Sequence, residues 1–240
     1  MRNLLKKNVL LVAGALVMSL SLPLRAQTVI YNNSVNDQLY RFNPGTTEIG
    51  DEILLANTER YLTLFSFEFW GTNTADPSNT SFAGAVQARV RFYQNDGPVF
   101  NGYATPGTLF YDSGWYGGFA PTPRSTLVYT EAGGDFPGGG LYMPVISNMT
   151  WSVQFQGMGA TDSLGVDIYS PPVVGQNYDD YWEYDSANNV WTLLQNPSAP
   201  NGQMNFGALM EAVPEPSALA LSLVGGLSIL AMTRRLRRKE

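Results

Sequence analysis

The chain has 240 residues with 20 Asp and Glu against 14 Lys and Arg, a net charge of −6, and it contains no Cys and no His. These absences exclude disulfides, thiol nucleophiles, Ser-His-Asp triads and zinc sites built on thiolate or imidazole. The catalytic chemistry that remains is a pair of carboxylates, as in glycosidases, or a carboxylate-bound calcium ion.

The first 26 residues have the organisation of a secretory signal peptide. Arg2, Lys6 and Lys7 precede an apolar run over residues 9–22, and Ala26 supplies a small residue after it. This run is shorter than the roughly 20 apolar residues that span a bilayer. We therefore predict export through the secretion translocon and cleavage between Ala26 and Gln27.

The middle of the chain is strongly acidic. Residues 27–212 keep five Arg and no Lys against 18 Asp and Glu, which gives this segment a net charge of −13. Such a surface repels phosphate backbones, so we expect no nucleic acid partner. It attracts cations instead.

Eleven segments of the middle region have the pattern of β-strands. Apolar and polar residues alternate most clearly over residues 61–70, 86–93 and 149–156. Shorter candidates are residues 29–32, 39–42, 52–55, 108–111, 126–129, 164–169, 181–184 and 190–194. Turn-forming runs such as Asn43-Pro44-Gly45 separate the candidates.

The fold class follows from this pattern. No stretch of ten or more residues in the middle region shows a helical stripe, and strands with one wet face recur at short spacing. This favours an all-β protein, with a single antiparallel β-sandwich of jelly-roll type over residues 27–212. In the second strong candidate strand, Arg89 and Arg91 project from one face, and we expect them to pair with neighbouring carboxylates.

One acidic and aromatic stretch is a candidate glycan contact. Tyr178, Asp180, Tyr181 and Trp182 lie in a run in which aromatic and acidic residues interleave. An aromatic ring stacks on the apolar face of a sugar while a carboxylate accepts hydrogen bonds from its hydroxyls. The alternative is an edge strand whose acids face outward and whose rings lie in the core.

The sequence carries no specific motif for calcium binding or for catalysis. A structural calcium ion remains an alternative because Asp96, Asp112, Asp162, Asp167, Asp179 and Asp180 lie in or beside turns, although no ligand motif is present. A glycosidase would need two carboxylates across a cleft, and the sequence does not select a pair from Glu52, Glu68, Glu131 and Glu183. We therefore expect no cofactor and no enzymatic activity.

The C-terminal segment, residues 213–240, has three parts in order. Pro214-Glu215-Pro216 comes first, and an apolar run over residues 217–233 follows. These 17 residues span about 26 Å as a helix, enough for a bilayer core. A basic tail comes last and predicts a cytoplasmic end; it consists of Arg234, Arg235, Arg237, Arg238 and Lys239.

This tripartite end resembles the PEP-CTERM sorting signal of bacterial exported proteins. The resemblance covers about 27 residues, and the N-terminal signal belongs to the same pattern. It implies an exosortase-type membrane enzyme as partner, which cleaves near Pro214-Glu215-Pro216, and a membrane-anchored precursor whose body is released or re-attached at the cell envelope. The family often occurs in organisms that make exopolysaccharide.

The sequence therefore predicts an exported cell-envelope or extracellular-matrix protein with a structural or adhesive role. One alternative is a module that binds exopolysaccharide, and a second is a carboxylate-dependent glycosidase.

Overall fold

The computed structural model describes residues 27–145 and 147–214. Within these ranges the regular structure is β-strand, apart from one turn of 3₁₀-helix at Pro200–Gly202. In the same ranges no helix is long and apolar enough to cross a membrane. The predicted signal peptide, apolar C-terminal span and basic tail lie outside the described residues, as do Glu215 and Pro216.

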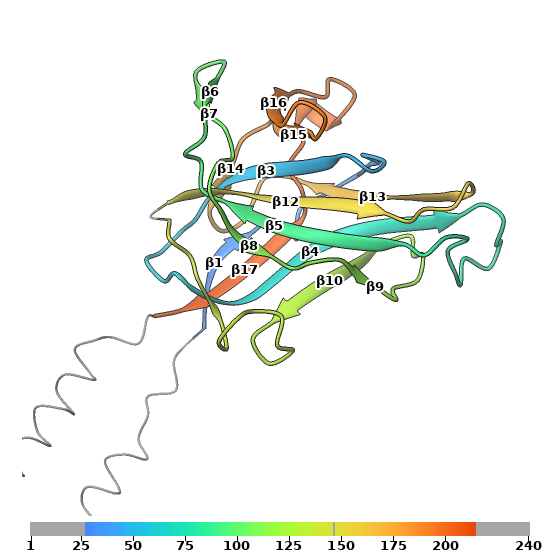
Figure 1. Ribbon diagram of the computed structural model, residues 1–240, viewed down its shortest axis with the longest axis horizontal. Coiled ribbons are helices and arrows are strands. Elements are labelled where there is room, and N and C mark those ends of the chain that lie inside the picture. Colours follow the sequence, from blue (N-terminus) through green and yellow to red (C-terminus); the bar gives the residue numbers. More distant parts are fainter. Residues whose placement is uncertain (1–26, 146, 215–240) are drawn as a thin grey trace, which may run out of the picture.

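Seven strands form one antiparallel sheet around a long central strand, β4 (Figure 1). The registers place β10 and β11 along one edge of β4, and β17 and β13 along the other. β1 then pairs with β17, and β2 with β13. The strands are β1 (Thr28–Asn32), β2 (Asp37–Phe42), β4 (Tyr61–Asn73), β10 (Ser125–Thr130), β11 (Leu141–Tyr142), β13 (Asp162–Tyr169) and β17 (Ala208–Val213).

Eight strands form a second antiparallel sheet, in the order β16-β15-β3-β12-β5-β8, with β14 beside β3 and β9 beside β5. Its members are β3 (Glu48–Leu54), β5 (Gln87–Tyr93), β8 (Leu109–Asp112), β9 (Tyr116–Gly117), β12 (Asn148–Gln156), β14 (Gln176–Asn177), β15 (Tyr181–Asp185) and β16 (Val190–Leu194). A separate small hairpin of β6 (Val99–Phe100) and β7 (Tyr103–Ala104) lies near β15 and β16 (Figure 1).

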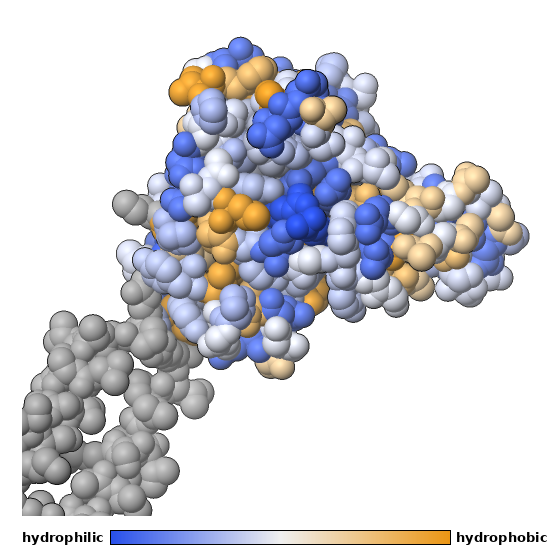
Figure 2. Space-filling view, in the orientation of Figure 1, coloured by the Kyte–Doolittle hydropathy of each residue, from blue (hydrophilic) through white to orange (hydrophobic). Residues whose placement is uncertain are grey.

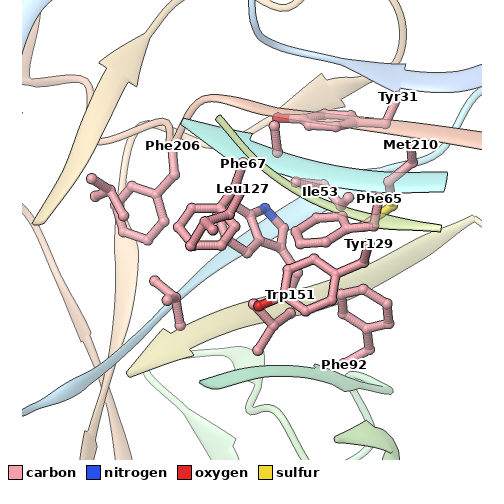
Figure 3. Close-up of a cluster of buried hydrophobic side chains, with 14 of the residues drawn as sticks. Tyr31, Ile53, Phe65, Phe67, Phe92, Leu127, Tyr129, Trp151, Phe206 and Met210 are labelled. Atoms are coloured by element: carbon pink, nitrogen blue, oxygen red, sulfur yellow. The ribbon is translucent and has the colours of Figure 1, made fainter. Parts of the chain in front are cut away.

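A shared aromatic core joins the two sheets (Figure 3). Trp151 of β12 is fully buried, and its ring centroid lies 5.3 Å from that of Phe65 on β4 and 5.8 Å from that of Phe206. Phe65 also contacts Phe92 of β5 edge to face at 5.0 Å. Because side chains from both sheets fill one core, the architecture is consistent with a β-sandwich.

The two ends of the described chain lie side by side. Thr28 pairs with Ala212 where β1 runs along β17, and both strands leave the body at the same end (Figure 1). Gln27 is tied to the central strand by a hydrogen bond that its Nε2 donates to Thr63 Oγ1 at 3.0 Å. The β15–β16 and β6–β7 hairpins lie away from that end.

All eleven predicted strands are present, with ends that shift by a few residues. The sequence analysis missed β17, which pairs with β1 and β4 inside a sheet, and the two-residue strands β6, β7, β9, β11 and β14. β17 was missed because its sequence, ALMEAV, is rich in residues that favour helices. Pairing on both edges overrides that preference.

Candidate functional site

The most developed polar site lies on the outer face of the eight-stranded sheet. Alternation along β5 buries Ala88, Val90 and Phe92 in the core and turns Arg89 and Arg91 to the opposite face. In Figure 1, β5 and β12 lie in front of β1 and β17, so this outer face is the one in view. Figure 2 shows a strongly hydrophilic patch at its centre.

Glu48 of β3 lies at the centre of this polar site, whose charged side chains we call the floor. Its side chain is almost fully buried, and it accepts hydrogen bonds from Ser152 Oγ at 2.6 Å and from Tyr93 Oη at 3.0 Å. Arg91 forms an ion pair with the second carboxylate oxygen. The buried carboxylate is therefore satisfied by two hydroxyls and a guanidinium, as a buried charge requires.

A second carboxylate continues the floor. Asp112 of β8 accepts a hydrogen bond from Arg89 Nε at 2.8 Å, pairs with Nη2 of the same side chain, and lies 3.5 Å from Arg91 Nε. The hydrogen bond from Arg89 lowers the pKa of Asp112, so its carboxyl is charged at neutral pH. Two carboxylates and two guanidiniums thus alternate in one network, and the expectation that the arginines pair with neighbouring acids is confirmed.

Aromatic rings stand at both ends of this network. Tyr184 and Trp191 pair across the β15–β16 hairpin with ring centroids 4.9 Å apart, and Trp191 contacts Tyr93 edge to face at 5.5 Å. At the other end, the guanidinium of Arg89 lies 5.7 Å from the ring centroid of Trp115. Trp191 itself is only 7% exposed, so the aromatic surface on the two sides of the charged network comes from the partly exposed rings of Tyr184 and Trp115.

An open groove of about 640 Å³ is lined by Glu48, Arg89, Arg91, Tyr93, Asp112, Tyr184 and Trp191, whereas Trp115 lies outside this lining. The β15–β16 hairpin forms one wall of the groove. The β6–β7 hairpin and the segment before β8 form the other wall, through residues such as Phe100 and Pro106. Three of the side chains that line the groove are large, apolar and well exposed: Val99 at 72%, Leu109 at 44% and Val190 at 46%. Apolar side chains held in water around a polar floor are typical of a binding site.

The predicted glycan contacts are only partly accessible. Trp182 is fully buried, with its ring centroid 6.5 Å from that of Phe100, and Tyr181 packs against Phe42 and Phe206. Tyr178 is exposed and Asp180 is half-buried. Neither Trp182 nor Tyr181 presents a face to solvent, but β15 pairs with both β3 and β16, so it is not the edge strand of the alternative interpretation. Tyr181 belongs to the core, whereas Trp182 is covered from the other side, where it contacts Phe100.

The carboxylates considered for catalysis do not meet in the groove. Glu52 and Glu183 lie on β3 and β15, Glu68 lies on β4 in the other sheet, and Glu131 follows β10. Burial raises the pKa of Glu52 and of Glu68, but each lies outside the groove lining. The two carboxylates that line the groove, Glu48 and Asp112, are both held by arginine.

Two of the aspartates considered as calcium ligands accept hydrogen bonds that join one loop of the protein to another. Asp96 accepts hydrogen bonds from the Thr108 backbone N–H at 2.6 Å and from its hydroxyl at 2.7 Å. Asp162 accepts from the backbone N–H groups of Ala83, Gly84 and Gly159 at 2.8–2.9 Å. Over residues 27–145 and 147–214 no three acidic side chains cluster as metal ligands would.

Sequence reasoning placed Arg89 and Arg91 on one face but missed Glu48, Tyr184 and Trp191 as their partners in a site. The alternation of residues 86–93 fixes which side chains share a face. This alternation carries no information on which distant strands lie beside Arg89 and Arg91. The other residues of the site could therefore not be predicted from it.

Comparison with known protein families, with curated proteins and with solved structures finds no match for this chain. The resemblance of the C-terminal segment to PEP-CTERM sorting signals therefore stays a prediction.

Proposed function

We propose that this is an exported protein of the cell envelope or extracellular matrix, with an adhesive or structural role exerted by binding polysaccharide in the groove. The observation that carries the proposal is the alternation of Arg89, Asp112, Arg91 and Glu48 along a floor flanked by aromatic rings. Fixed donors and acceptors between stacking surfaces are what sugar hydroxyls and sugar C–H faces require.

The fold that we propose for the body is a jelly roll. Strands early in the chain pair antiparallel with strands late in it: β1 with β17, β2 with β13 and β3 with β12. The first two pairs lie in the seven-stranded sheet and the third lies in the eight-stranded sheet, and this pairing of early with late strands supports the proposal.

Export and sorting form the second part of the proposal. The signal peptide is cleaved between Ala26 and Gln27, and an exosortase-type enzyme processes the precursor at Pro214-Glu215-Pro216 while residues 217–233 hold it in the membrane. Thr28 pairs with Ala212, so the two predicted processing boundaries lie at the same end of the body, which supports this division. The hairpins at the groove lie away from the end where β1 and β17 leave the body, so the groove faces outward in an anchored precursor.

No observation favours the glycosidase alternative. A glycosidase needs one carboxyl group that can donate a proton, with a raised pKa. In the groove the pKa of Asp112 is lowered by Arg89, and Glu48 is ion-paired to Arg91. We therefore propose binding without hydrolysis.

Retention of the protein on the exopolysaccharide of its own cells tests the binding function. Tyr184→Ala removes one ring of the groove, and we expect about tenfold weaker retention, a change of about 1.4 kcal/mol. Tyr142→Ala is the matched control, because Tyr142 is 55% exposed on β11 of the other sheet. Equal retention of the wild type and the Tyr184 variant, with melting temperatures unchanged, would refute binding in the groove.

A further inference from the structure

We infer that the groove takes an uncharged hexose chain rather than an acidic polysaccharide. This inference rests on the proposed function and names the class of its ligand. It has three independent supports: the charge balance of the floor, the hydrogen-bonding groups left over by the ion pairs, and the length of the floor.

The charge balance comes first. Each guanidinium of the floor already faces a carboxylate: Arg89 is held by Asp112, and Arg91 by Glu48 and by Asp112. An anionic sugar would have to displace an internal carboxylate or bring an uncompensated third negative charge into the site. Because the body carries a net −13, its long-range field opposes the approach of a polyanion as well.

The floor still has hydrogen-bonding capacity that suits hydroxyl groups. The ion pair of Arg89 uses its Nε and Nη2, and Nη1 makes no hydrogen bond within the part of the chain that the structure describes. An ionised carboxylate can accept about four hydrogen bonds. Glu48 accepts three, and Asp112 accepts three, from Arg89 Nε and Nη2 and from the Gly114 backbone N–H. A neutral diol can donate to a carboxylate and accept from a guanidinium without altering the charge of the site.

The floor of the groove is long enough for a chain of sugars rather than for a single sugar. Tyr93, Arg91 and Arg89 alternate along β5, so the floor extends about 13 Å from the side of Trp191 to the side of Trp115. This length exceeds one sugar ring. The exposed apolar side chains Val99, Leu109 and Val190 add contact surface for the C–H faces of further rings.

Direct titration distinguishes the two ligand classes. The full-length protein, in a detergent without a sugar headgroup, is titrated calorimetrically with cellohexaose, maltohexaose and mannohexaose, with their monosaccharides, and with hexagalacturonate. We expect at least one neutral hexaose to bind at least about tenfold more tightly than its monosaccharide and than hexagalacturonate. Because no charge pairing is involved, raising NaCl from about 50 to 500 mM leaves that affinity unchanged.

Variants locate the binding. Tyr184→Ala weakens binding of the neutral hexaose about tenfold, Tyr184→Phe restores it, and Tyr142→Ala leaves it unchanged. Tighter binding of hexagalacturonate, lost in the Tyr184→Ala variant, would overturn the neutral class while the polysaccharide-binding function stands. Absence of binding by every neutral hexaose would also overturn the inference, and retention on the cells' own polysaccharide then decides the proposed function separately.

Discussion

Asp51 of β3 gives the protein an intrinsic sensitivity to alkaline conditions. Its side chain is fully buried, Oδ2 accepts a hydrogen bond from the Phe206 backbone N–H at 3.0 Å, and Oδ1 has no partner among the described residues. Burial raises the pKa of this carboxyl well above its usual value, and the nearby Asp180 and Glu52 raise it further. Folding therefore favours the protonated form of Asp51.

The direction of the pH dependence follows from proton binding. In the unfolded chain Asp51 has a pKa of about 3.9 and releases its proton as the pH rises, whereas the folded state keeps it. Above that pH the unfolded state binds fewer protons, so the free energy of unfolding falls as pH rises. The fall continues until the pH reaches the raised pKa of the folded state, and a single group can contribute at most about 1.4 kcal/mol per pH unit.

Asp51→Asn removes this pH dependence, because the amide keeps the acceptor for the Phe206 N–H and cannot ionise. We expect the free energy of unfolding of the variant, relative to wild type, to increase as the pH rises above the unfolded-state pKa, with a slope of at most about 1.4 kcal/mol per pH unit. Guanidinium denaturation at several pH values measures this difference. Titrating groups that do not interact with Asp51 contribute equally to both proteins and cancel.

Asp76→Asn is the matched control. Asp76 is exposed, and hydrogen bonds from Thr80 lower its pKa, so it is ionised in both states above pH 5. Its difference from wild type should stay constant over the same range. If the Asp51 variant also shows a constant difference, Asp51 is ionised in the folded protein and the assignment of a buried neutral carboxyl is wrong.

Three further predictions concern other parts of the chain. Trp182→Ala should lower the free energy of unfolding by about 3–5 kcal/mol, because its ring is fully buried, and an unchanged denaturation midpoint would contradict this packing. Burial raises the pKa of Asp167 to about 6 despite Arg41 and Arg124. The melting temperature of Asp167→Asn should therefore exceed that of wild type by a margin that grows from pH 4 to pH 6 and stays constant above pH 6. A difference in melting temperature that does not change between pH 4 and pH 6 would contradict the raised pKa. Glu215→Gln should leave uncleaved, membrane-held precursor in the native cells, which fractionation and intact mass measure, and normal processing would refute recognition of the motif.

The sequence by itself determined the fold class and the positions of most strands. Period-two alternation depends on neighbouring residues alone, which is why residues 61–70, 86–93 and 149–156 were identified as strands. The same local rule placed Arg89 and Arg91 on one face. It failed for β17, where intrinsic preference and tertiary pairing point in opposite directions.

Tertiary structure alone decided which strands are neighbours, and with that the site. Glu48 meets Arg91 across 43 residues and Ser152 across 104, and the hairpin that carries Tyr184 joins them from another 32 residues along the chain. It also decided that Trp182 is covered while Trp191 lines a groove. Strand alternation specifies which face of a sheet a side chain occupies, but it does not specify which other strands lie beside that face. The packing of one shared core selects those neighbours.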